Sequence, residues 1–544
     1  MAKKVKSSDL QNLPACAADF IKLIIRKMGY RKKVRADVQA ELAAHFEDEL
    51  KDCKTDEEKE KRAEKLITEF GDVKLLAVLM RRAKKRCRPL WRKALVRSLQ
   101  FAGVILLYLI LCVSPLIVGR PTISVDYVER LNELVRADRN EADNARPYYE
   151  KALEFYVKTP QWLDLSTSDW PTDFNDVQLR SLNLWLQDNQ KAFEALRKAA
   201  EQPCFWNDYQ KSSPTVDDLV VALMPNVMQP LTTYRTLAFA MRWKIRYEAY
   251  KGNIDLAIKD CIVLQKFGKH LQGKGLLIEQ LVGVAIEALP LSEILSILDR
   301  TDVPAETLKT VRDELARQVE KRKPVIKLEA EKVFWFDQIQ RTFTDDGSGD
   351  GRVLLRGLPY AIKGWKDFIG FMRFSYPGRK EVVANIDSYF EEFDRFLEKT
   401  PSDLKNLGIY ENKIDGFEQT GPLLLRSLVH SSFIRISQMS WRLETHRRSV
   451  LTIVAVMRYR KTLGRYPDNL EELVSTGYLD NLPMDPFSGS PLIYRRTDDG
   501  FTLYSIGMDF KDDGGVPGCD SEGRPRMWAE NGDWVFWPVL KTEK

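Results

Sequence analysis

The chain has 544 residues, of which 44% are hydrophobic and 30% are charged. This composition is typical of globular proteins and excludes a largely disordered chain, and the length allows three or four domains. The formal net charge of +6 is unevenly distributed, because residues 1–97 contain 26 Lys and Arg against 15 Asp and Glu, whereas the rest of the chain is acidic. The basic excess therefore belongs to one end of the chain.

Residues 99–119 contain no charged side chain and directly follow the densest run of Lys and Arg. An apolar helix of about 20 residues matches the hydrocarbon thickness of a bilayer, and Lys and Arg gather on the cytoplasmic side of a span. The alternatives are a buried core helix and, for the basic run, a nucleic-acid patch. The length and the basic flank favour one membrane span whose flank contacts anionic lipid, with the N-terminus cytoplasmic and no nucleic-acid partner.

Residues 1–90 are predicted to form a small cytoplasmic helical domain. Apolar residues recur at helical spacing in residues 18–30, 34–51 and 56–70 and again from Val73 onward. On the pattern of residues 41–48, Ala63, 70–72 and 76–77, this domain resembles the helical domain that precedes the spans of bacterial permease-prefix and related signalling proteins. The resemblance implies a module that interacts with other proteins. Within it, His45 is expected to be a partly buried helix histidine, the alternative being a functional histidine.

Residues 120–439 are predicted to form a large α-helical ectodomain. The clearest feature is a helical hairpin of residues 237–250 and 254–271, with small residues where the two helices would meet. One helical pattern runs through residues 173–200, and two more helices are expected at 276–289 and 291–298. No fixed 34-residue period is present, so the sequence predicts an irregular, solenoid-like arrangement, an architecture that often binds protein segments.

Four tryptophans of this region, Trp162, Trp170, Trp185 and Trp206, are expected to pack between helices, the alternative being a ligand platform. The three cysteines after the span, Cys204, Cys261 and Cys519, allow at most one disulfide, and the sequence does not indicate which pair would form it. Residues 345–351 have carboxylates spaced like the start of a calcium loop. Gly357 stands where the closing Glu should be, so a solvated acidic turn is favoured.

Residues 440–544 are predicted to form an α+β domain. A helix is expected over residues 441–463, followed by a short helix capped by Asp468, and three strands at 493–496, 501–506 and 534–537. The dipeptide Asp499-Gly500 is typical of the tight turn of a hairpin.

The order of motifs in this domain is the most specific signal in the chain. The domain resembles the globular domain of the major pseudopilin of type II secretion systems, on residues 464–467, Leu470, Leu473, 477–479, 482–483, 485–486, Tyr494, 503–509 and 514–515. The resemblance implies a long helix packed on a small antiparallel sheet, with a calcium ion in the loop before the last strand.

The resemblance also implies calcium ligands in that loop. Asp509 matches the first acidic ligand and the carbonyl of Ile506 a neighbouring backbone ligand. The second acidic ligand is ambiguous among Asp512, Asp513, Asp520 and Asp533, because the loop is longer than in the family. The alternative is that these aspartates only cap turns.

The chain departs from a pseudopilin in having this domain more than 300 residues after the span and without the basic leader and cleavage motif. Assembly into a pseudopilus is therefore not expected. No HExxH, GxSxG, Walker or dinucleotide motif is present, and the only histidines after the span are His270, His430 and His446.

Taken together, the sequence predicts a mainly α, multidomain protein of a bacterial inner membrane, with domains at 1–90, 99–119, 120–439 and 440–544. The function expected is non-enzymatic binding of partner proteins outside the membrane, which the pseudopilin resemblance connects with secretion, and the sequence gives no indication of a small-molecule substrate. The alternatives are an envelope hydrolase with an unrecognised site and a transmembrane signalling protein.

Overall fold

The computed structural model describes residues 10–86, 90–117, 120–167, 169–210, 224–319, 326–354, 378–408 and 430–540. Cys87 and the last two residues of the apolar segment, Val118 and Gly119, lie outside these ranges. The chain divides into two compact units, residues 1–111 and 112–544, and each has a hydrophobic core of its own. The fold is mainly α-helical with one small sheet, as the sequence predicts.

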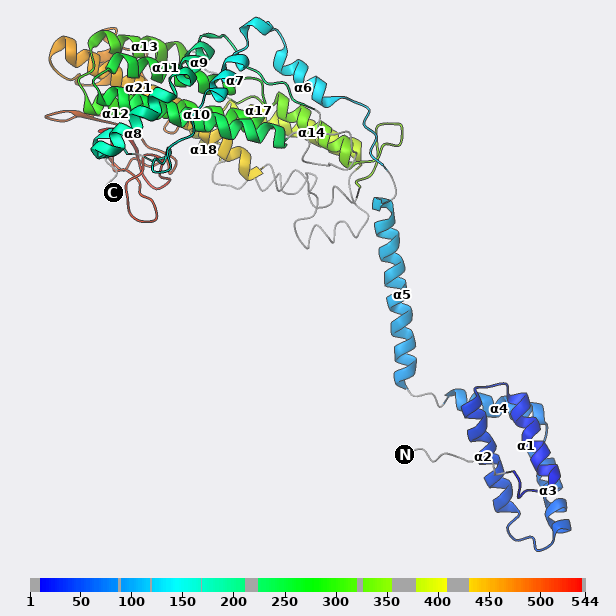
Figure 1. Ribbon diagram of the computed structural model, residues 1–544. Coiled ribbons are helices and arrows are strands. Elements are labelled where there is room, and N and C mark those ends of the chain that lie inside the picture. Colours follow the sequence, from blue (N-terminus) through cyan, green and yellow to red (C-terminus); the bar gives the residue numbers. More distant parts are fainter. Residues whose placement is uncertain are drawn as a thin grey trace. The chain divides into compact units, whose positions relative to one another are not determined.

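The first unit contains a bundle of four short helices, α1 (Ala15–Met28), α2 (Lys32–Glu49), α3 (Asp56–Phe70) and α4 (Val73–Arg86). Helix α1 packs against the other three (Figure 1). Its Phe20 meets Phe46 of α2 and Phe70 of α3, with ring centroids 6.2 and 6.0 Å apart. The Thr55 hydroxyl and the Glu58 carboxylate form a capping box that fixes the start of α3. The four helices predicted from the sequence are confirmed.

Helix α5 (Leu90–Ile117) contains the apolar segment. Its window Ala94–Leu111 has a mean hydropathy of 2.0, and none of that window is buried in the structure. A second apolar helix, α12 (Leu277–Arg300), passes the same test of length and composition, but 56% of its window is buried. Three buried glutamates lie on α12, so α12 is a core helix of the second unit.

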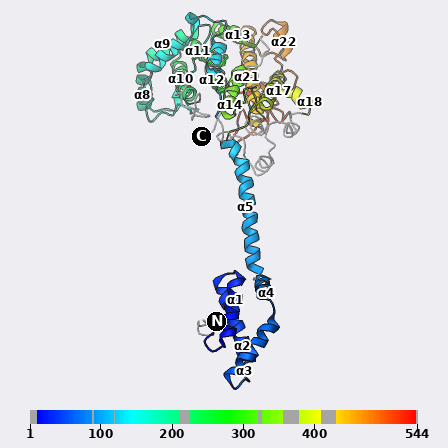
Figure 2. The same ribbon diagram turned by 90° about the vertical axis from the view of Figure 1, so that its right-hand side faces the viewer.

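The second unit contains the remaining helices and the sheet. Its first helices are α6 (Tyr127–Arg136), α7 (Arg146–Glu154), α8 (Asp176–Asp188), α9 (Gln190–Glu201), α10 (Met224–Tyr250), α11 (Ile254–Leu271), α12 and α13 (Ala305–Val319). They are followed by α14 (Glu329–Thr342), α17 (Arg379–Leu397), α18 (Pro401–Asn406), α21 (His430–Leu463) and α22 (Leu470–Ser475). Helices α10, α11 and α12 lie side by side (Figure 2), and α10 and α11 form the helical hairpin that the sequence predicts.

Buried ion pairs tie these helices together. Arg197 of α9 forms two hydrogen bonds to Asp260 of α11, at 2.8 and 2.9 Å. Arg246 of α10 binds Glu293 of α12 in the same bidentate way, at 2.9 and 2.8 Å. A buried charge is costly unless it is paired, so the position of each of these helices depends on its neighbour.

The strands β1 (Ile493–Arg496), β2 (Phe501–Ser505) and β3 (Trp534–Trp537) form an antiparallel sheet in the order β1-β2-β3. Arg496 pairs with Phe501 across the predicted hairpin. Both β2 and β3 pack against α21, and α21 also packs against α12 and α13. Buried apolar residues of the helices and of the sheet form one continuous core, so the C-terminal elements and the preceding helices belong to one compact unit.

The helical pattern over residues 173–200 is confirmed, and the structure divides it into two helices, α8 and α9. The buried side chain of Asn189 lies at the division and bonds both backbone groups of Val157. The predicted break near Pro290 does not exist, and α12 continues through it because Glu287 and Glu293 anchor both halves.

Two corrections concern the C-terminal region. The helix expected from residue 441 begins eleven residues earlier, as α21. The cap of α22 is Asn469, whose side chain accepts the amide N–H of Glu472 at 2.9 Å, whereas Asp468 lies one residue too early and pairs with Arg496.

Candidate functional site

The loop between β2 and β3 contains the aspartates for which the sequence predicts calcium. Asp533 directly precedes β3 and is fully buried. Its Oδ2 accepts the amide N–H of Gly515 at 2.6 Å, whereas its buried Oδ1 has no hydrogen-bond partner. Burial raises the pKa of the Asp533 carboxyl; the backbone N–H groups of Gly515 and Asp513 partly oppose this, and the charges of Asp512 and Asp513 add to it.

The loop backbone is shaped around this carboxylate. Gly515 has a φ of +86°, and a Cβ there would lie 3.3 Å from the ring of Tyr504, so only glycine suits the position. The Tyr504 hydroxyl donates to Asp512 at 2.9 Å, and the amide of Gly514 donates to the same carboxylate oxygen. Asp512, Asp513 and Asp533 are therefore brought into one part of the loop.

The other predicted ligands have different surroundings. Asp509 accepts the amide N–H of Lys511 at 3.1 Å and so caps its own turn. Asp520 is bound by Arg524 and Arg526, and its pKa is lowered by these contacts and by backbone N–H groups. Ile506 lies directly after β2, and its amide donates to the buried Asp485.

An unpaired buried carboxylate oxygen with two further carboxylates near it is the donor set that a hard cation such as calcium prefers. Within the described ranges, however, no three carboxylate, imidazole or thiolate groups are gathered closely enough to hold a metal ion. Asp512, Asp513 and Asp533 would therefore have to move closer together to share one.

The second acidic stretch, residues 345–351, is a capped turn. Asp346 accepts both the amide and the hydroxyl of Ser348, at 2.8 and 2.7 Å, and Asp350 accepts the amide of Lys380 at the start of α17. Asp345 forms an ion pair with Arg379 at 2.8 Å. These contacts favour the acidic turn over an ion site. Gly357 lies outside the described residues.

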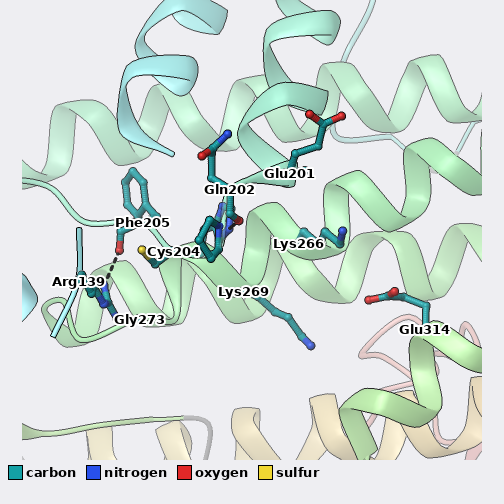
Figure 3. Close-up of a pocket in the computed structure, with 12 residues that line it drawn as sticks. Arg139, Glu201, Gln202, Cys204, Phe205, Lys266, Lys269, Gly273 and Glu314 are labelled. Atoms are coloured by element: carbon teal, nitrogen blue, oxygen red, sulfur yellow. Dashed lines mark hydrogen bonds between the residues drawn. The ribbon is translucent and has the colours of Figure 1, made fainter. Parts of the chain in front are cut away.

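A cavity of about 440 Å³ lies between the end of α9, α11, α13 and the segment after α6 (Figure 3). Charged side chains of both signs line it: Arg139, Glu201, Lys266, Lys269 and Glu314. The guanidinium of Arg139 donates to the carbonyl of Phe205 at 3.0 Å. The sequence gives no indication of this cavity, because its residues come from four separate segments.

The cysteine and histidine of this cavity are not arranged as a nucleophile and its base. His270 bonds the Tyr149 hydroxyl through Nδ1 at 2.7 Å and the carbonyl of Gln202 through Nε2 at 3.1 Å. Because a carbonyl only accepts, Nε2 carries the proton and Nδ1 accepts from Tyr149. Burial lowers the pKa of His270 to about 4, and burial raises the pKa of the Cys204 thiol. At neutral pH both groups are therefore uncharged.

A buried pair of carboxyl groups lies beside this cavity, at the start of α12. Glu279 accepts the amide of Leu276 at 2.8 Å and the Tyr209 hydroxyl, and Glu331 of α14 accepts the amide of Leu277 at 3.2 Å. Burial raises the pKa of both groups, for Glu331 to about 7. The space beside Glu279 is only about 10 Å³, roughly the room of one water. The two carboxyl groups hold the start of α12 by accepting its backbone amides, and the space beside Glu279 is too small for a substrate.

Most of the expectations for histidine, tryptophan and cysteine side chains can be checked directly. The expected partial burial of His45 is wrong: its side chain is exposed, with its ring centroid 5.5 Å from that of Phe70. His446 is buried against Phe536 and Trp528, whereas the side chain of His430 lies outside the described residues. Trp170, Trp185 and Trp206 are buried, as expected for packing, and Trp162 is 37% exposed. Cys204, Cys261 and Cys519 are all free thiols in the structure.

Comparisons of the chain with protein-family models, with curated proteins and with solved structures found no match.

Proposed function

We propose that this protein is a single-pass, membrane-anchored, non-enzymatic protein of the bacterial envelope whose outer helical and pseudopilin-like parts bind partner proteins. The observation that carries the anchoring is that no residue of the Ala94–Leu111 window of α5 is buried, although its mean hydropathy is 2.0. An exposed helix of this apolar character needs apolar surroundings, and a bilayer supplies them. The basic run before α5 supports a cytoplasmic N-terminus.

An exposed apolar patch on the second unit supports partner binding. Val177 and Leu184 lie on the outer face of α8 and are 71% and 59% exposed. Ser181, between them on the same face, accepts the indole N–H of Trp162 at 3.0 Å, so the half-exposed Trp162 adjoins this face. We call Trp162, Val177 and Leu184 the α8 patch. An aromatic anchor beside exposed aliphatic side chains is typical of the centre of a protein interface.

The chemistry of the cavity disfavours the alternative of an envelope hydrolase. Cys204 is a protonated thiol, His270 uses both ring nitrogens, and the space beside Glu279 holds no more than about one water. These are residues that hold helices in place. Signalling across the membrane remains an alternative role of the same anchored architecture and needs a partner or oligomerisation to transmit the event.

Partner binding is tested by cross-linking in membranes, followed by capture of the full chain at native expression. We expect the same envelope proteins to be recovered repeatedly and to be lost with Val177→Asp/Leu184→Asp. Leu407→Asp/Leu463→Asp, which places the same two charges on exposed leucines outside α8, is the matched control and should keep them. Recovery of the chain alone, or equal recovery with both variants, would contradict the proposal.

Calcium binding by the loop before β3 is a second proposal, and the unpaired Oδ1 of Asp533 favours it. Asp512, Asp513 and Asp533 would supply the carboxylates, and ion binding would neutralise their mutual repulsion. Calorimetry and thermal unfolding of the full chain in detergent with added Ca²⁺ should show heat and a raised midpoint, both lost in Asp533→Asn. Asp346→Asn, in the other acidic turn, is the control. The absence of heat and of a shift in the parent chain would end this proposal.

A further inference from the structure

We propose that the outer face of helix α4 lies on the cytoplasmic surface of the membrane and binds the headgroups of anionic lipids. This inference rests on the proposed anchoring by α5 and adds a second membrane contact, made by the folded N-terminal bundle. Helix α4 packs on α1 (Figure 2), and the inference rests on the side chains of α4 that remain exposed.

The first half of this face is apolar. Leu75, Val78 and Leu79 are 60%, 45% and 51% exposed, although Ala77 on the opposite side of the same helix is buried in the bundle core. Their spacing of three and four residues places all three on one side of the helix. Exposed aliphatic side chains are common singly, whereas three adjacent ones on one helical face indicate a surface that is covered in use.

The second half of the same face is basic. Arg82 continues the row of Leu75, Val78 and Leu79 at the next helical spacing, and Lys85 follows it; both are exposed. Lys84, by contrast, lies toward the bundle and forms an ion pair with Glu41 of α2 at 2.5 Å. The exposed face of α4 therefore runs from aliphatic to cationic.

The composition of α4 favours lipid over a second copy of the chain as the occupant. Residues 73–86 contain five Lys and Arg after position 80, and they contain no Asp or Glu. Two such helices packed in parallel would bring their cations together, and two packed antiparallel would place the cations of each helix on the leucines of the other. A bilayer surface accepts both halves, because the aliphatic side chains enter the boundary of headgroups and acyl chains while the cations meet lipid phosphates.

The chain also keeps this face within reach of the membrane. Three residues separate the end of α4 at Arg86 from the start of α5 at Leu90, and the apolar window begins at Ala94. Eight residues span at most about 28 Å even when extended. This connection therefore keeps the end of α4 within about 28 Å of the membrane surface once α5 is inserted.

Photocrosslinking of the full chain in vesicles tests this directly. A photoreactive amino acid replaces Val78 or, as the control, Lys65 on the exposed side of α3. The chain is placed in phosphatidylcholine vesicles with or without about one third phosphatidylglycerol, and the crosslinked products are identified by their mass. We expect the yield of phosphatidylglycerol adducts at position 78 to be at least about fivefold above the yield at position 65. Arg82→Glu/Lys85→Glu should lower the yield at position 78 by about fivefold or more, because each cation near an anionic surface contributes binding of that order. The matched reversal Lys61→Glu/Lys65→Glu, with the probe at 78, should leave the yield unchanged.

Equal lipid labelling at positions 78 and 65, or a covalent dimer as the main product at 78, would overturn the inference. Retention of the chain after an alkaline wash of the same vesicles separately tests the anchor. A retained chain without lipid adducts at position 78 therefore refutes the role of α4 alone, whereas a released chain refutes the anchoring.

Discussion

The ion pair between Arg447 of α21 and Glu287 of α12 provides a sharp test of the contact between the C-terminal elements and the preceding helices. The two side chains are 7% and 0% exposed, and two hydrogen bonds of 2.9 and 2.7 Å join them. Gln272 donates to the same carboxylate at 2.7 Å. Substitution of Arg447 by Met keeps the bulk of the side chain but leaves the buried Glu287 carboxylate with an amide as its remaining partner.

Breaking a buried pair in this way costs about 3–5 kcal/mol, because one charge is left uncompensated. Glu287→Gln in the same chain removes that charge and still accepts from Gln272, so the double variant should lose only about 1 kcal/mol. Arg317→Met, which breaks an exposed pair with Glu314, is the control and should cost under about 1 kcal/mol.

The assay is unfolding of the full chain in detergent, followed by tryptophan fluorescence. All tryptophans except Trp91 lie in the second unit, so the signal reports on that unit. A cost for Arg447→Met no larger than that of Arg317→Met, or a double variant less stable than the single one, would refute the packing of α21 on α12 through this pair.

Two further predictions concern residues that contact α12. The folded pKa of Glu331, about 7, lies above its unfolded value, so its contribution to stability is present below about pH 4.5 and lost as the pH rises through 7. Glu331→Gln should therefore stabilise the chain by about 3 kcal/mol at pH 8 and by under about 1 kcal/mol at pH 5, and a pH-independent difference in the unfolding free energy would contradict this. A Cβ at Gly268 would lie 2.5 Å from the backbone nitrogen of Glu287, so Gly268→Ala should cost about 1–3 kcal/mol, whereas Gly103→Ala on α5, where nothing is within 4 Å, should cost nothing measurable.

Local patterns in the sequence predict much of this fold. The spacing of Phe20, Ile24 and Phe46 gives the helices of the first unit, and Asp499-Gly500 gives the hairpin of β1 and β2, because in both cases the signal lies within one helical or strand period. Helix ends and helix breaks could not be predicted where a residue distant in the sequence determines them. Asn189 ends α8 by bonding Val157, and Pro290 is accommodated because ion pairs to α10 and α21 hold both halves of α12.

The candidate sites likewise include one that a local sequence pattern predicts and one that depends on contacts between distant residues. Sequence motifs single out the acidic loop, but they leave the second acidic ligand open among Asp512, Asp513, Asp520 and Asp533 and cannot separate Asp533 from Asp520. That distinction depends on burial and on the arginines that bind Asp520. The pair of Glu279 and Glu331 has no local signal at all, because Tyr209 and the two glutamates come together only in the folded unit.

The most direct test of the proposed architecture is protease treatment of spheroplasts that carry the chain with an epitope at each end. If α5 anchors the protein with residues 1–86 in the cytoplasm, the N-terminal epitope remains on a protected membrane fragment that contains unit 1, while the C-terminal epitope is digested away. Protection of both epitopes in intact spheroplasts, or recovery of the whole chain in the soluble fraction, would contradict the account.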